Sequence, residues 1–380
     1  MVLFVSVFLN IKREEGMDGL TNSDIVQFEL LTGDFCKKSL SQFIDEHHPD
    51  GNFSILPSII DEACSIGIIT KAHHNASGYD YGIWGKQTLT STDAIINSLT
   101  MLSVLASTCA SFAFLAHIQG LAANILIQRD IENNTAYPFL SLYNELLPPH
   151  YQTVVHPSSH AIKLDNPFIA QLHGYGYNPC YAIVCVPDTS GWSMLYFDSV
   201  QTILLQSIKT HGLRGLYYKA RFNSDITATI PVSNHTIELL FAFFWLGIAA
   251  ISIGIAQSAY LKAINYAHQR YQRGSVIKNI ESVQMLLGAS KAKIETAKNA
   301  LFSFTASDSY LLLKHAAHSK LIVTTLCSQV VTDCLQVFGG YGYMEDFGIE
   351  KKFRDINTLA TIGGSPFFMK QFIAQMEMEE

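Results

Sequence analysis

Histidine and cysteine are the side chains of this sequence best suited to holding a metal ion, and their spacing does not favour a metal site. Two histidine pairs have a spacing compatible with a shared ion, namely His156 with His160 and His315 with His318. Because the chain contains fourteen histidines, such pairs arise readily by chance. Cys180 and Cys185 do not form the Cys-x2-Cys pair typical of zinc sites. We therefore expect no structural metal.

The seven cysteines also argue against a framework of disulfide bonds. Their number is odd and their spacing irregular, at positions 36, 64, 109, 180, 185, 327 and 334. This usage is typical of reduced thiols in a cytoplasmic protein. The sequence therefore predicts a cytoplasmic location.

Composition excludes further classes of function. The formal net charge is -7 and no run of Lys and Arg exceeds two residues, so nucleic acid is not an expected partner. No Gly-x-Gly-x-x-Gly stretch follows a predicted strand, which argues against a βαβ nucleotide-binding fold. With 380 residues, of which 48% are hydrophobic, the chain can build two or three domains.

Hydrophobic periodicity predicts the order α, then β, then α along the chain. Ile25, Phe28, Leu31 and Phe35 recur at helical spacing, and the patch 73–82 interrupts the first helical region as a loop. Short β-branched and aromatic runs at 181–186 and 194–197 predict strands in a proline-rich middle third. The expected division is a tail without fixed structure at 1–22, an all-α domain at 23–132, a β domain at 133–233 and a helical bundle at 234–380.

The segment 239–261 has the length of a membrane span and no charged residue. The alternative is a helix buried on all sides in a bundle, with Gly247, Ala250 and Gly254 permitting close helix approach. We favour burial, because the following helix is amphipathic and no other segment is equally apolar. The apolar residues 1–11 are too short to span a bilayer and lack the features of a signal peptide.

Two stretches resemble signatures of the acyl-CoA dehydrogenase family. The run 335–355, LQVFGGYGYMEDFGIEKKFRD, is similar to the family's Gln-x-x-Gly-Gly-x-Gly followed by Glu-x-x-x-Arg-Asp. The run 266–277, YAHQRYQRGSVI, is similar to Tyr-Ala-x-x-Arg-x-x-Phe-Gly-x-x-Ile, with Arg273 where Phe is usual. The resemblance implies an α+β fold with an N-terminal helical domain, a small β-barrel or sandwich and a C-terminal four-helix bundle.

The resemblance also implies a shared FAD site. In the family FAD lies between two subunits, so Arg270 would contact its pyrophosphate, while Gln336, Gly339 and Gly340 would approach the adenosine half of a flavin held mainly by the neighbouring subunit. On the glycines alone, a simple turn between helices at 339–342 is the alternative.

The family's contacts to its own flavin are missing from this sequence. Neither the Thr-Glu-Pro-x-Ala-Gly-Ser-Asp stretch nor the Trp-Ile-Thr strand occurs between residues 121 and 180. The resemblance therefore does not extend to binding of an isoalloxazine ring by this chain itself.

The family's catalytic carboxylate is missing as well. Counting along the family pattern places Gly363 at the usual position of the base and Phe244 at the alternative one, and neither side chain can remove a proton. Trp245 replaces the Arg that commonly follows the alternative base. Glu238 lies six residues from Phe244 and is not expected to act as a relocated base.

These features lead to several hypotheses about function. The first is a non-catalytic subunit that completes the FAD site of a catalytic paralogue in a heteromeric acyl-CoA dehydrogenase, with acyl-CoA as the substrate of the complex. The alternatives are a flavin-dependent enzyme of the same fold with monooxygenase or oxidase chemistry, a flavin-free structural or regulatory protein, and a conventional dehydrogenase with an unrecognised base. The expected partner is the paralogue or, alternatively, a further copy of this chain in a homo-oligomer.

Overall fold

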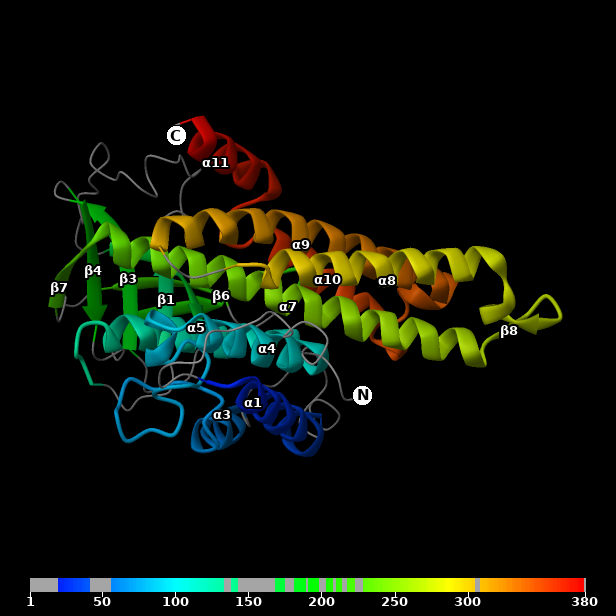
Figure 1. The fold of residues 1–380 in the computed structure, drawn as a ribbon, viewed down its shortest axis with the longest axis horizontal. Coiled ribbons are helices and arrows are strands. Elements are labelled where there is room, and N and C mark those ends of the chain that lie inside the picture. The colour runs from blue at the N-terminus through cyan, green and yellow to red at the C-terminus, as the bar shows by residue number, and fades with distance from the viewer. Residues whose placement is uncertain are drawn as a thin grey trace.

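The structure is a computed structural model with helices at both ends of the chain and a sheet in the middle (Figure 1). It describes residues 20–41, 56–132, 138–142, 168–174, 181–188, 191–197, 203–207, 210–213, 217–222, 228–304 and 308–378. The predicted order α, β, α is confirmed.

The described part of the N-terminal region is helical, and its first described helix is capped. Thr21 and Asp24 form a capping box, in which the Asp24 carboxylate accepts the Thr21 backbone N–H at 2.8 Å. The predicted loop at 73–82 consists of turns and bends. The main helices of this region are α1 (Asn22–Phe35), α3 (Leu56–Ser65), α4 (Thr92–Thr108) and α5 (Ala110–Ile127).

The described strands of the middle region form one seven-stranded sheet in the order β5-β6-β2-β1-β3-β4-β7. All neighbouring pairs are antiparallel except β1 with β3. The two strands predicted from the sequence correspond to β3 and β4. The other connections of this region, and with them the predicted barrel or sandwich, lie outside the described residues. The strands are β1 (Pro138–Leu142), β2 (Phe168–Gly174), β3 (Tyr181–Asp188), β4 (Gly191–Phe197), β5 (Ile203–Ser207), β6 (Tyr217–Phe222) and β7 (Ala228–Val232).

The C-terminal region is a bundle of long helices that runs along the longest axis of the molecule (Figure 1). The sheet lies at one end of this axis, and a short hairpin, β8 (Tyr271–Gln272) with β9 (Ser275–Val276), lies at the other. The bundle helices are α7 (Asn234–Gln269), α8 (Glu281–Phe302), α9 (Ser309–Phe338) and α10 (Ile349–Thr361).

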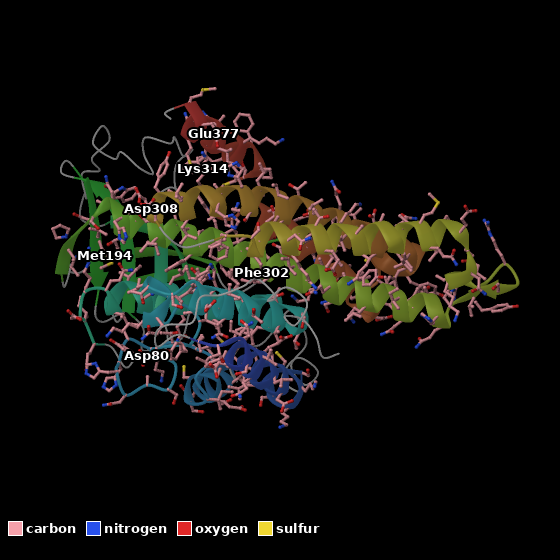
Figure 2. All side chains as sticks on the ribbon, viewed as in Figure 1. Asp80, Met194, Phe302, Asp308, Lys314 and Glu377 are labelled. Atoms are coloured by element: carbon pink, nitrogen blue, oxygen red, sulfur yellow. The ribbon has the colours of Figure 1, made fainter. Side chains whose placement is uncertain are left out.

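A last helix, α11 (Pro366–Met378), packs against α9. Lys314 on α9 and Glu377 on α11 form an ion pair at 2.9 Å, and Figure 2 labels both side chains. This ion pair joins the C-terminal end of α11 to α9.

The apolar segment 239–261 lies within α7, and its most apolar window is completely buried inside the protein. The prediction of burial is therefore confirmed. By length and composition α5, α7 and the segment 309–343 could each cross a membrane, and α5 is likewise completely buried.

Small residues on α7 permit the close approach that the sequence predicts. A Cβ at Gly247 would lie 2.2 Å from the His117 ring on α5, and a Cβ at Gly254 would lie 2.2 Å from the Ser103 carbonyl oxygen on α4. Contacts this short exclude any side chain at either position. The N-terminal helices therefore rest directly on the backbone of α7.

Candidate functional site

A cavity of about 640 Å³ lies at the end of the bundle that carries the hairpin. It is formed where α7 ends, α8 begins and α9 ends. It brings together all four residues that the sequence assigns to cofactor binding, Arg270, Gln336, Gly339 and Gly340. The remaining lining residues are Tyr266, Gln272, Arg273, Ile277, Ile280, Ser282, Val283, Leu286, Val337, Phe338, Tyr341 and Met344.

Arg270 sits where α7 gives way to the hairpin, and local contacts fix its backbone. Its N–H donates to the Tyr266 carbonyl at 2.9 Å, and its carbonyl accepts the Ile277 N–H at 2.8 Å. The guanidinium carbon lies 5.1 Å from the centroid of the Tyr341 ring. This cation–π contact holds the permanently charged guanidinium group of the half-buried Arg270 at the cavity wall.

The structure explains differently why glycine occupies positions 339 and 340, the two glycines predicted to bind the cofactor. Gly339 has φ +59°, a conformation that favours glycine, and it ends α9. Gly340 has no positive φ, and a Cβ built there would meet no atom within 4 Å among the described residues beyond its chain neighbours. A turn between helices therefore explains Gly339 but not Gly340. The open space beside Gly340 is what close approach of a ligand would need.

The cavity suits a ligand with an anionic part and an apolar part. Arg270 and Arg273 line it, while no aspartate or glutamate is among those of its lining residues that the structure describes. The side chains of α8 that line it are mostly aliphatic. A volume of about 640 Å³ is in the usual range for small-molecule sites. The residues therefore fit the pyrophosphate and adenosine half of FAD.

The two positions expected for a catalytic base lie in direct contact and leave no room for a carboxylate. Gly363 has φ +65°, and a Cβ built there would lie 2.2 Å from Cε1 of Phe244. Both residues are buried. The Phe244 ring thus fills the space into which a side chain at position 363 would project.

A buried histidine holds the Phe244 ring in place. The His117 ring stacks on it at a centroid distance of 5.6 Å and an interplanar angle of 14°. The Trp84 Nε1–H donates to His117 Nδ1 at 2.8 Å, so Nε2 must carry the proton that is donated to the Phe244 carbonyl at 3.1 Å. His117 is therefore a neutral imidazole in the Nε2–H form with a hydrogen bond at each nitrogen.

The backbone of the Gly363 loop is also held from both sides. The indole Nε1–H of Trp245 donates to the Gly363 carbonyl at 2.7 Å, and the buried Lys320 ammonium donates to the Gly364 carbonyl. Trp245, which the resemblance aligns with an Arg common in the family, thus has a structural contact here.

The Arg-Asp pair of the signature fixes the helix that precedes this loop. Asp355 accepts the Leu213 N–H at 2.9 Å, and Arg354 donates to the His211 carbonyl at 3.2 Å, so α10 is tied to the segment 210–213. Lys351 contacts Asp355 at 2.6 Å. Burial is the largest single influence on the pKa of Lys351 and lowers it, but the charge and hydrogen bond of Asp355 together with the nearby Cys109 leave this pKa above its ordinary value.

Other candidate residues from the sequence lie away from both sites. The Glu238 carboxylate accepts a hydrogen bond from Ser309 at 2.6 Å. His315 contacts the Leu301 carbonyl at 3.2 Å and His318 contacts the Lys314 carbonyl at 2.8 Å. Within the described residues no group of three or more His, Cys, Asp or Glu side chains could hold a metal ion. The pair at 156 and 160 lies outside them.

Sequence reasoning missed the role of three residues. His117 and Trp84 are far from Phe244 in the sequence, and no local pattern indicates that they support its ring. The sequence marks Arg273 only as a departure from the pattern that the resemblance implies, although this residue lines the cavity. A basic residue before Gly274 in a short turn was the one available signal.

Comparisons with known proteins agree with this description. Residues 237–377 match the family described as acyl-CoA dehydrogenase, C-terminal domain. The 3-(aryl)acrylate reductase of Clostridium sporogenes is 30% identical over 176 residues, 45% of this chain and 43% of that protein. The caffeyl-CoA reductase-Etf complex subunit CarC of Acetobacterium woodii is 27% identical over 137 residues, 36% of each. The matched part therefore spans less than half the length of either relative.

Among solved structures, butyryl-CoA dehydrogenase from Megasphaera elsdenii superposes with a TM-score of 0.70 at 17% identity. The match covers 95% of this chain and 100% of that chain. At this identity the likeness shows the fold, and the predicted acyl-CoA dehydrogenase fold is confirmed to that extent.

Proposed function

We propose that this chain, whose residues 237–377 match the C-terminal domain of acyl-CoA dehydrogenases, is a non-catalytic subunit that completes the FAD site of a catalytic paralogue in a heteromeric acyl-CoA dehydrogenase. One contrast carries the proposal. The residues offered to a cofactor gather in an open cavity, while the position of the base is closed by contact between Gly363 and Phe244.

In the proposed complex this chain binds and orients rather than reacts. The Arg270 guanidinium would pair with pyrophosphate oxygens, the Gln336 amide would hydrogen-bond to the adenosine half, and the missing side chains at Gly339 and Gly340 would let the ligand approach the backbone. Bound FAD supplies the acceptor for a hydride from the acyl group. The paralogue would supply the carboxylate that removes the α-proton.

Dehydrogenation by this chain alone lacks a proton acceptor at the usual place. Glu238 is bonded to Ser309, and the sequence has no other acid between 239 and 280 or between 356 and 376. The proposal of a partner is supported by the relative CarC, which is named as a subunit of a reductase-Etf complex.

A flavin-free structural role is the second candidate, and the Arg270–Tyr341 stacking favours it. That contact gives the guanidinium a partner within this chain at 5.1 Å. On this reading Arg270 stabilises the end of the bundle and no ligand occupies the cavity.

Co-expression with a paralogue that retains the glutamate separates these candidates. We expect the chain alone to be largely colourless, and the co-expressed complex to contain flavin at fewer than one FAD per chain. Absorbance and denatured-flavin quantification give the stoichiometry. One tightly bound FAD per chain in the isolated protein, bleached by an acyl-CoA, would contradict the proposal, and a flavin-free complex would favour the structural role.

A further inference from the structure

The turn of the hairpin beside the cavity contains Arg273 at a position where such turns usually have Asn, Asp or Gly. Tyr271 pairs with Val276 and Gln272 with Ser275, so Arg273 and Gly274 form a two-residue connection. Both have positive φ, +53° and +82°. Two-residue hairpins with this geometry favour Asn, Asp or Gly at the first position and Gly at the second.

Arg273 therefore occupies a conformation that is sterically unfavourable for a side chain of its type. Left-handed backbone at a residue other than Gly, Asn or Asp is uncommon, and such strained positions cluster at functional sites. The geometry of the turn does not explain a long basic side chain at this position. The location of Arg273 does explain it, because Arg273 lines the same cavity as Arg270.

Two arginines thus line one cavity, and none of its described lining residues is acidic. The Arg270 group lies 5.1 Å from the centroid of the Tyr341 ring, whereas Arg273 is exposed. Guanidinium groups pair with phosphate oxygens in a bidentate manner, so two of them match two neighbouring phosphates better than one.

We infer that Arg273 is a second anion-binding residue of this cavity, and that with Arg270 it selects nucleoside ligands with two linked phosphates over those with one. The inference rests on the proposed function, because it concerns the same site. It adds a residue that the family pattern does not supply, since Phe is usual at that position.

The test compares ADP-ribose with AMP by isothermal titration calorimetry on the full chain at pH 8. Both probes carry about two negative charges there, because the second pKa of a phosphate monoester is about 6. Their difference therefore reports the number of linked phosphates rather than net charge. The variant is Arg273→Asn, which suits the left-handed conformation and removes the guanidinium.

The matched control is Lys278→Asn, which removes one exposed positive charge five residues away without changing a lining residue. We expect wild type and the control to prefer ADP-ribose over AMP by about tenfold or more, the effect of one charge-assisted hydrogen bond. In Arg273→Asn the preference should fall to about twofold, while the AMP affinity changes little.

A preference in Arg273→Asn within about twofold of wild type would overturn the inference, as would a wild-type chain that does not bind ADP-ribose at millimolar concentration. The proposed function is tested separately by the FAD content of the complex. If Arg273→Asn has no effect while loss of Arg270 and Gln336 lowers FAD binding, the inference alone fails.

Discussion

Replacing Gly363 by alanine is the smallest change that probes the closed base position. The new Cβ would lie 2.2, 2.9 and 3.2 Å from Cε1, Cδ1 and Cζ of the Phe244 ring. That ring cannot swing away, because it is buried and stacked on the His117 ring. His117 is itself held by two hydrogen bonds, one from the Trp84 indole and one to the Phe244 carbonyl.

Two costs add in this variant. Alanine at φ +65° carries a backbone penalty of roughly 1–2 kcal/mol. Overpacking against a fixed aromatic ring typically costs about 1–3 kcal/mol. We therefore expect Gly363→Ala to lower the free energy of unfolding by about 2–5 kcal/mol. Gly340→Ala is the matched control, because its Cβ meets nothing within 4 Å, and it should change stability by less than about 0.5 kcal/mol.

Urea unfolding followed by tryptophan fluorescence measures both variants, since Trp84 and Trp245 lie beside this contact. The double variant Gly363→Ala with Phe244→Leu should recover the packing part, giving a coupling energy of about 1–3 kcal/mol. Equal stability of Gly363→Ala and Gly340→Ala would refute the conclusion that the base position is closed.

Three further predictions test the same account. Gly363→Glu should create no acyl-CoA dehydrogenase activity in the protein alone, because Phe244 fills the space for the carboxylate; measurable flavin reduction by any acyl-CoA would contradict this. His117→Leu should cost about 1–3 kcal/mol in urea unfolding by leaving the Trp84 N–H without its acceptor, and a loss below about 0.5 kcal/mol would show that the hydrogen bond is unimportant. Burial raises the pKa of four thiols, so their thiolate fraction at pH 8 falls, and peptide mapping should find them alkylated by iodoacetamide only after unfolding; rapid labelling of the native protein would be contrary. These thiols are Cys36 and Cys64, each with a pKa raised to about 11, Cys334, raised to about 12, and Cys327.

Much of the architecture could be predicted because it depends on local patterns. The burial of 239–261 followed from its lack of charge and its small residues, and Gly247 and Gly254 are now seen to meet α5 and α4. The hairpin at 271–276 was not predicted, because each of its strands has only two residues and shows no alternation.

The residues of the candidate site could be predicted from the sequence, but the contacts between them could not. Motif matching selected Arg270 and Gln336, and the structure brings them to one cavity although 66 positions separate them in the chain. Counting also located Gly363 and Phe244, yet it could not show that they touch. That contact depends on how α7 packs against the loop after α10, and an all-round apolar helix has no preferred face from which packing can be read.

The central claim is that this chain contributes to a flavin site which a partner completes. Its most direct test is titration of FAD into the apo-complex by fluorescence quenching, comparing wild type with Arg270→Ala plus Gln336→Ala. Lys278→Ala plus Gln284→Ala, at the same end of the bundle but outside the cavity lining, is the matched control. A lost charge-assisted contact is worth about 1.5–3 kcal/mol, so we predict roughly ten- to hundredfold weaker FAD binding in the cavity variant and no change in the control. FAD affinity of the folded cavity variant within about twofold of wild type would contradict the claim.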